Sequence, residues 1–220
     1  VGSEMCIRDS YDIGLNLFTS SFPDPEKIIS EAEAAGICCI LTGSEAAENE
    51  KVNDFVKTHA VYGTAGIHPH SADRAEEADL HRIGEIVSSN PKIVAVGECG
   101  LDYDRMYSSK ENQLYYFKKL IALAEKLEKP LFLHQRDAEE DFLACFDGHE
   151  EICRRSVVHC YTGNREMAEK LIGMGFYIGI TGWICDERRA DDLREAVKYI
   201  PLERILLETD APYLTPRGIP

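Results

Sequence analysis

Short apolar runs alternate with longer amphipathic stretches along almost all of this 220-residue chain. The runs are rich in β-branched residues, and the stretches repeat their apolar positions at the period of an α-helix. This alternation is typical of βα units, whose strands pair in parallel. Helices are predicted over stretches such as 25–35, 78–88, 110–127, 138–146, 165–174 and 190–199. Eight strands are predicted, at 11–17, 37–41, 61–67, 93–98, 131–134, 157–159, 177–181 and 205–209.

Eight strands with intervening helices favour a TIM-like (β/α)8 barrel, with an open doubly wound sheet as the alternative fold. The chain is long enough for one domain with a substantial core, although it is short for such a barrel. Residues 11–220 contain no linker or low-complexity stretch, so we expect a single domain. No helical pattern follows the eighth predicted strand, and we therefore expect a barrel that lacks its last helix in a chain truncated at its C-terminus. Residues 1–10 fit no periodic pattern and are interpreted as a non-native or disordered leader.

The formal net charge of −15 limits the ways in which this chain can meet nucleic acid. A protein that wraps duplex DNA by neutralising its backbone is normally basic, so an architectural DNA-binding role is excluded. An acidic enzyme can still process nucleic acid where bound cations and a few local arginines meet the phosphates. Charge therefore excludes one mode of binding and leaves the other open.

The eight cysteines do not indicate a disulfide framework. No CxxC pair is present, and several cysteines, Cys99 and Cys160 among them, lie in strand-like apolar runs where they behave as small packing residues. The chain shows no secretory signal and no apolar run near the ~20 residues that a membrane span needs. Reduced thiols, a cytoplasmic location and no membrane association are the resulting expectations.

Four residues with metal-binding side chains lie at the C-terminal ends of separate predicted strands: Glu98, His134, His159 and Asp210. Their spacing fits one βα unit between each of the first three and two units before the last. In a β/α barrel, those strand ends converge on one mouth, where active sites are built. Two imidazoles and two carboxylates suit Zn, Mn, Fe or, with waters, Mg. The sequence therefore predicts a divalent-metal site at the mouth, formed by these four residues.

Two further histidines extend the third predicted strand into the same mouth. His68 is a candidate for orienting substrate or transferring a proton, since a near-neutral imidazole suits that work. The competing interpretation, a loop histidine held by the backbone, is favoured for His70. Glu208 faces the barrel interior with Asp210, either as a partner of a ligand histidine or as a buried, paired acid.

The first predicted strand lacks the histidine pair with which many metal hydrolases of this architecture begin. Asp12, Gly14 and Asn16 share one face by period-two alternation, so glycine and asparagine stand at the two histidine positions. Asn16 can offer a carbonyl oxygen to a hard cation, which shifts the expected preference toward Mg or Mn over Zn.

Candidate substrate contacts follow the strands that form the mouth. Arg136, Arg188 and Arg189 can bind phosphate through bidentate donors, and Trp183 can stack on a base. The competing interpretations are solvated surface charges for the arginines and a loop anchor for the tryptophan. Asn16 joins Arg136 and Trp183 in the predicted substrate-binding set.

Several of these residues lie in longer motifs that resemble one known family. The chain is similar to the TatD family of metal-dependent deoxyribonucleases from residue 11 to about residue 216, and the segment 178–189 (IGITGWICDERR) narrows the match to the branch that gives the family its name. The other motifs are 66–70 (GIHPH), 96–102 (VGECGLD), 133–137 (LHQRD), 158–163 (VHCYTG) and 207–213 (LETDAPY).

This resemblance implies a TIM-like barrel that hydrolyses DNA phosphodiesters at a divalent-metal site. We expect one or two ions, with Mg²⁺ favoured and Mn²⁺ or Zn²⁺ possible. The resemblance also implies 3′-to-5′ trimming of single-stranded DNA, with RNA as a further candidate substrate, in DNA repair or degradation. The family's ligands match Glu98, His134, His159 and Asp210. Asp210 would also accept the proton of the attacking water, Glu98 would bridge two ions if both are present, and His68 would position the phosphate or protonate the leaving oxygen.

Two other functions remain open on the sequence. An amidohydrolase-like enzyme acting on a small amide or ester would keep the barrel, although paired-metal amidohydrolases usually carry a carbamylated lysine where Glu98 stands. A non-catalytic barrel would keep the metal only to stabilise its fold. The oligomeric state is open as well, with a monomer favoured.

Overall fold

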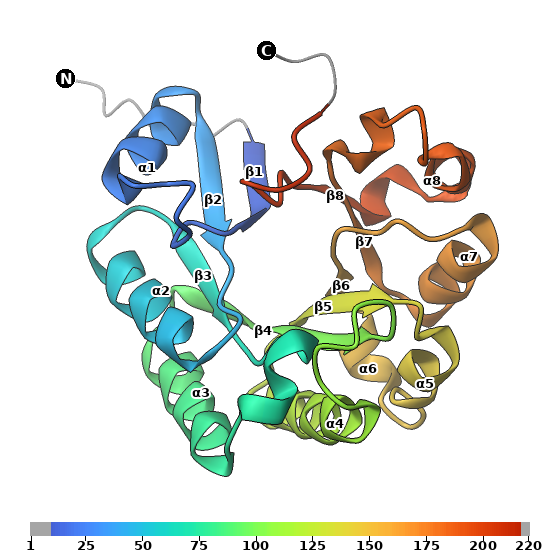
Figure 1. Cartoon of the computed structure of the whole chain (residues 1–220), viewed down its shortest axis with the longest axis horizontal. Coiled ribbons are helices and arrows are strands. Elements are labelled where there is room, and N and C mark those ends of the chain that lie inside the picture. The colour runs from blue at the N-terminus through green and yellow to red at the C-terminus, as the bar shows by residue number, and fades with distance from the viewer. Residues whose placement is uncertain (1–9, 217–220) are drawn as a thin grey trace.

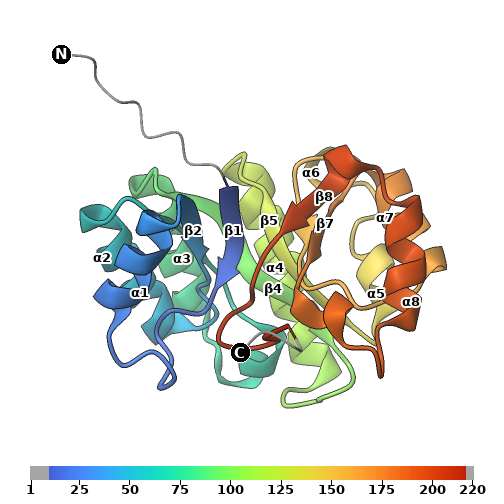
Figure 2. The ribbon, with the colours of Figure 1, turned by 90° about the horizontal axis from the view of Figure 1, so that it is seen from above.

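The eight strands form one parallel sheet in which each strand pairs with the next along the chain. The computed structural model describes residues 10–216. The sheet order runs from β1 to β8 without a crossover, and a bridge between Leu15 and Ala211 joins the end of β1 to the segment after β8. The sheet thus curves into a nearly closed barrel (Figures 1 and 2), which confirms the TIM-like fold and excludes the doubly wound sheet. The strands are β1 (Ser10–Leu15), β2 (Ile37–Leu41), β3 (Tyr62–Ala65), β4 (Ile93–Asp102), β5 (Leu131–Arg136), β6 (Val157–Val158), β7 (Tyr177–Ile180) and β8 (Ile205–Leu207).

The helices surround the strands, as Figure 1 shows in a view down the barrel. The α-helices are α1 (Pro25–Ala34), α2 (Ala46–Thr58), α3 (Glu77–Ser89), α4 (Lys110–Lys126), α5 (Glu139–Ala144), α6 (Glu150–Cys153), α7 (Arg165–Met174) and α8 (Asp191–Ala196). Short 3₁₀ helices are η1 (Pro69–Arg74), η2 (Gly182–Cys185), η3 (Val197–Tyr199) and η4 (Leu202–Arg204).

Local sequence signals explain where α7 begins and ends. The Asn164 side chain accepts a hydrogen bond from the backbone N–H of Met167 at 3.0 Å, as an N-cap residue does. Gly175 ends the helix with a φ of +100°, a left-handed conformation that glycine adopts without a steric penalty. This helix therefore keeps its predicted bounds of 165–174.

The ends of the chain partly lie outside the described residues. Ser10 belongs to β1, whereas residues 1–9 of the predicted leader are not described. Between β8 and Pro216, the last described residue, the structure contains no further helix. Within residues 10–216, no disulfide forms, and no helix is both long and apolar enough to cross a membrane.

Two apolar cores hold the sheet in place. The larger lies between the strands and the surrounding helices and includes residues such as Phe117, Phe142 and Leu171. A smaller one, inside the barrel, consists of Ile13, Ala95, Phe132 and Val157. The Phe132 ring stacks on the imidazole of His159 with a centroid distance of 4.4 Å. The inner core thus ends directly beneath the polar residues of the mouth.

Candidate metal centre

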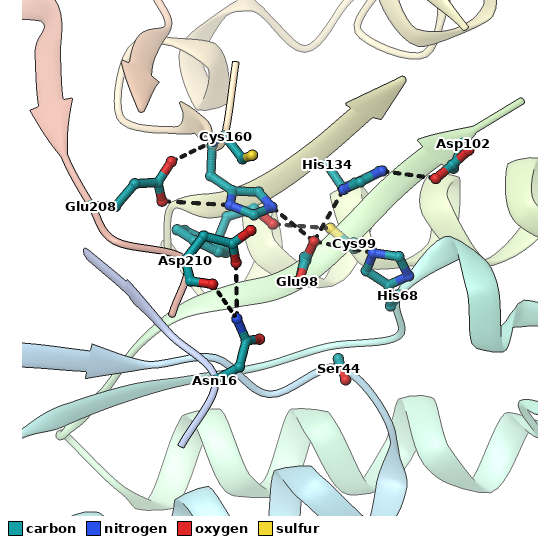
Figure 3. Close-up of polar contacts among 12 residues, drawn as sticks. Asn16, Ser44, His68, Glu98, Cys99, Asp102, His134, Cys160, Glu208 and Asp210 are labelled. Carbon is teal, nitrogen blue, oxygen red and sulfur yellow. Dashed lines mark hydrogen bonds and ion pairs between the residues drawn. The ribbon is translucent and has the colours of Figure 1, made fainter. Parts of the chain in front are cut away.

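Three imidazoles surround one carboxylate oxygen at the C-terminal mouth of the barrel. Glu98 Oε1 lies 2.8 Å from His159 Nε2, 3.1 Å from His68 Nε2 and 3.2 Å from His134 Nδ1 (Figure 3). Glu98 is in β4 and His134 is in β5. His159 directly follows β6, and His68 lies just beyond β3. The Glu98 side chain is only 8% exposed, so these contacts form away from bulk water.

The residues of this cluster fit a divalent cation. Glu98, His134 and His159 each offer a ligand atom, and these atoms lie within 4.8 Å of one another. A carboxylate oxygen and two imidazole nitrogens are ligands that Zn²⁺, Mn²⁺ and related ions accept. Three of the four predicted ligands are thus brought together.

Asp210, the fourth predicted ligand, stands beside this group and not within it. It follows β8 at a φ of +53°, and its Oδ1 accepts a hydrogen bond from Asn16 Nδ2 at 2.8 Å. Burial raises the pKa of Asp210 to about 6, although the nearby charge of His159 acts in the opposite direction. Asn16, predicted as a substrate contact, thus donates a hydrogen bond from its amide nitrogen to Asp210 (Figure 3).

The electrostatics of the cluster favour charged partners. Burial by itself disfavours an imidazolium, but the charges and hydrogen bonds of the carboxylates outweigh it and raise the pKa of His134 and His159. Burial also acts to raise the pKa of Glu98, and the imidazoles of His68, His134 and His159 reverse this effect and hold it well below its usual value. These contacts thus favour the ionised form of Glu98 and the protonated forms of His134 and His159.

His68 is held in one tautomer by the backbone. Its Nδ1 accepts a hydrogen bond from the backbone N–H of His70 at 3.0 Å, so a neutral ring carries its proton on Nε2. Burial lowers the pKa of His68 more than the charge of Glu98 raises it. His68 therefore offers a neutral N–H donor at the mouth.

Asp102 belongs to the site and was not among the predicted site residues. Its Oδ2 lies 2.6 Å from His70 Nε2 and 3.2 Å from His134 Nε2. Asp102 lies four residues after Glu98 in β4, and this even spacing points both side chains to the same face of the strand. His70, interpreted as a loop histidine held by the backbone, instead contacts this buried carboxylate.

Glu208 and Glu98 face opposite nitrogens of His159, Nδ1 and Nε2 respectively. Glu208 Oε2 is 3.5 Å from His159 Nδ1, and neither of these two buried atoms has a hydrogen-bond partner in the described structure. Glu208 is thus a buried acid that faces His159, one of the predicted ligands.

The predicted substrate contacts Arg136 and Trp183 lie near each other. The Arg136 guanidinium carbon is 6.0 Å from the centre of the Trp183 ring, and that of Arg189 is 3.8 Å from it. Arg136 Nε also lies 3.0 Å from Asp104 Oδ2. Arg188 and Arg189 both bind the carboxylate of Asp186, so Arg188 is engaged within its own loop.

Solved structures support the fold and relate it to known proteins. The crystal structure of YjjV, a TatD homolog from Escherichia coli, superposes with a TM-score of 0.86 at 27% sequence identity and covers 98% of this chain and 83% of that one. A hydrolase of the TatD family from Entamoeba histolytica superposes with a TM-score of 0.81 at 28% identity, covering 93% of this chain and 74% of that one.

Curated sequences give a narrower match. The "3'-5' ssDNA/RNA exonuclease TatD" of Erwinia amylovora is 45% identical over 216 residues, which are 95% of this chain and 82% of that protein. The protein of the same name from Escherichia fergusonii is 41% identical over 212 residues, 95% of this chain and 81% of the other. The sequence model described as "TatD related DNase" matches residues 11–220. With its barrel and its mouth of histidines and carboxylates, this chain belongs to the family of TatD-related DNases.

Proposed function

We propose that this chain is a divalent-metal-dependent exonuclease that removes nucleotides from the 3′ end of single-stranded DNA, and of RNA. The observation that carries the proposal is the group of Glu98, His134 and His159 at the barrel mouth of a TatD-related DNase. Relatives that bear the name of a 3′-5′ exonuclease on single-stranded DNA and RNA support the substrate and the polarity.

Glu98, His134 and His159 would hold the cation. When bound, a divalent ion polarises a phosphoryl group and lowers the pKa of a water molecule. Asp210 would accept a proton from the attacking water, and its half-buried position beside Asn16 suits a general base, whose pKa should lie near the working pH. His68 would donate its Nε2–H to a phosphate oxygen or to the leaving oxygen.

The rim residues would bind the strand that enters the mouth. Trp183 offers a ring for a base to stack on, and Arg136 offers donors for a phosphate. We also propose Mg²⁺ as the favoured ion, with Mn²⁺ or Zn²⁺ as alternatives and one or two ions bound. We further propose that the protein is a monomer and acts in the cytoplasm, in DNA repair or degradation.

Digestion of end-labelled single strands tests the proposed polarity and metal preference. We expect a strand labelled at its 5′ end to yield a ladder of shortening products, and one labelled at its 3′ end to release labelled mononucleotide at once. Parallel reactions with Mg²⁺, Mn²⁺ and Zn²⁺ rank the ions. Endonucleolytic fragments from both labels would contradict the exonuclease, and turnover of small amides or esters without DNA cleavage would favour an amidohydrolase.

Metal binding is expected to release protons and to strengthen as the pH rises. The carboxylates raise the pKa of His134 and His159, so each ring keeps its proton to a higher pH than an ordinary histidine, and a cation must displace that proton. Affinity should therefore be lowest below the ordinary histidine pKa and increase until both rings are neutral. Calorimetry of Mn²⁺ binding in buffers of different ionisation enthalpy measures the released protons. A binding constant that does not change between pH 6 and 9 would contradict this expectation.

A further inference from the structure

Each of the two imidazoles in the proposed metal centre lies between two carboxylates. Glu98 faces Nδ1 of His134 at 3.2 Å and Nε2 of His159 at 2.8 Å. The other nitrogen of each ring faces a different acid: Asp102 Oδ2 lies 3.2 Å from His134 Nε2, and Glu208 Oε2 lies 3.5 Å from His159 Nδ1. The two rings thus turn opposite nitrogens toward Glu98, and in both cases a second acid stands behind the ring.

Backbone N–H groups hold the carboxylates of Asp102 and Glu208 in the same manner. Asp102 Oδ1 accepts hydrogen bonds from the backbone N–H groups of Asp104 at 3.1 Å and Arg105 at 2.8 Å. Glu208 Oε1 accepts a hydrogen bond from the backbone N–H of Cys160. Because one oxygen of each acid is held by N–H donors, the other oxygen is left for imidazoles. Glu208 Oε2 faces His159, and Asp102 Oδ2 faces both His134 at 3.2 Å and His70 at 2.6 Å.

We propose that Asp102 and Glu208 are positioning residues that fix the tautomers of His134 and His159. An imidazole N–H that donates to a carboxylate leaves the lone pair on the opposite nitrogen, which is the one available to a cation. His134 would thus carry its proton on Nε2 and bind through Nδ1, whereas His159 would carry its proton on Nδ1 and bind through Nε2. This inference rests on the proposed metal centre and adds the part of the site that orients it.

Isosteric amides test the inference, because the backbone determines how they are oriented. In Asp102→Asn and in Glu208→Gln, the N–H donors retain the amide oxygen, so the amide NH₂ group faces the imidazole. The ring must then accept with that nitrogen and place its proton on the nitrogen that faces Glu98, where it blocks the cation. We expect the Mn²⁺ affinity of each variant, measured by calorimetry, to fall by roughly 10- to 100-fold.

A second readout separates this role from a merely structural one. In the Zn²⁺-loaded wild type, long-range ¹H–¹⁵N spectra should show protected ring N–H signals at His134 Nε2 and His159 Nδ1. Each variant should lose the signal of its own histidine and retain the other. Asp186→Asn is the matched control, since Asp186 is a buried carboxylate that binds Arg188 and Arg189, and its Mn²⁺ affinity should equal that of the wild type.

The outcomes decide between the possibilities. Unchanged affinity in both variants, or reduced affinity with unchanged ring signals, would overturn the inference. Each acid is replaced separately, and the melting temperature of the metal-free protein reports folding, so a variant that fails to fold leaves the other to decide. A wild-type protein that takes up neither Mn²⁺ nor Zn²⁺ would refute the metal centre itself, and this inference with it.

Discussion

Replacing Glu98 with glutamine is expected to slow the hydrolysis of single-stranded DNA by about 10³-fold, because a metal's stabilisation of the transition state is worth several kcal/mol and each 1.36 kcal/mol is tenfold in rate. Glu98 Oε1 is the single atom that His68, His134 and His159 all face. Glutamine keeps the shape of the side chain and removes the charge that attracts a cation. The loss should therefore exceed what a change in substrate binding alone would produce. Single-turnover digestion of a 5′-labelled strand at saturating enzyme measures the chemical step.

The matched control for Glu98→Gln is Glu125→Gln. Glu125 also faces a histidine, with its Oε1 2.8 Å from His149 Nδ1, but this pair joins α4 to the residue just before α6 and is partly exposed. The activity of the Glu125→Gln variant should remain within about twofold of the wild-type activity. This ion pair lies outside the candidate metal centre, and exposed ion pairs contribute little to stability. The metal centre would be wrongly assigned if folded Glu98→Gln protein hydrolysed DNA at the wild-type rate.

The strands and the candidate ligands at or near their ends could be predicted because both depend on local sequence. Apolar runs marked all eight strands, and the convergence of parallel strand ends then placed Glu98, His134 and His159 at one mouth. The strand ends were less predictable. Polar residues end the apolar pattern at 98 and 134, whereas β4 and β5 continue to pair through Asp102 and Arg136. Backbone hydrogen bonds extend these strands regardless of side-chain polarity.

The features of the site that could not be predicted from the sequence depend on contacts between distant segments. Asp102 lies beyond the apolar run of its strand, and its contact with His134 appears only when β4 and β5 are paired. Asp210 follows β8 at the mouth, but its left-handed backbone and its bond to Asn16 set its distance from the other predicted ligands. Helix α2 was not among the helices predicted from the sequence. It is highly polar, and its few apolar residues give only a weak helical periodicity.

The glycine on the first strand is explained by the space that Glu208 occupies. A Cβ atom at Gly14 would lie 2.7 Å from Glu208 Oε2 and 3.3 Å from Phe132 Cζ, and one at Gly179 would lie 2.5 Å from Glu208 Oε1. The carboxylate therefore sits between two glycines that leave room for it. A histidine at position 14 would have to displace Glu208 from its place beside His159 Nδ1.

Gly14→Ala is accordingly expected to reduce both metal affinity and stability. The added methyl group must push the Glu208 carboxylate away from His159 Nδ1, which should lower the Mn²⁺ affinity by roughly 10-fold or more. Overpacking in a filled interior should lower the free energy of unfolding by about 1–3 kcal/mol. Calorimetry and urea denaturation of the metal-free protein measure the two effects separately.

Two further variants show whether these losses come from Glu208. Gly173→Ala, in α7 with nothing within 4 Å of the added Cβ, should stabilise the protein by about 0.4–1 kcal/mol and leave metal affinity unchanged. Adding Glu208→Asp to Gly14→Ala should restore stability, because the shorter side chain withdraws from the methyl group, but it should not restore affinity, because the acid then no longer reaches His159. Gly14→Ala protein that binds Mn²⁺ as tightly as the wild type would show that the cation does not depend on the Glu208 carboxylate behind His159. The glycine would then serve packing alone, and the absence of a first-strand histidine would need another cause.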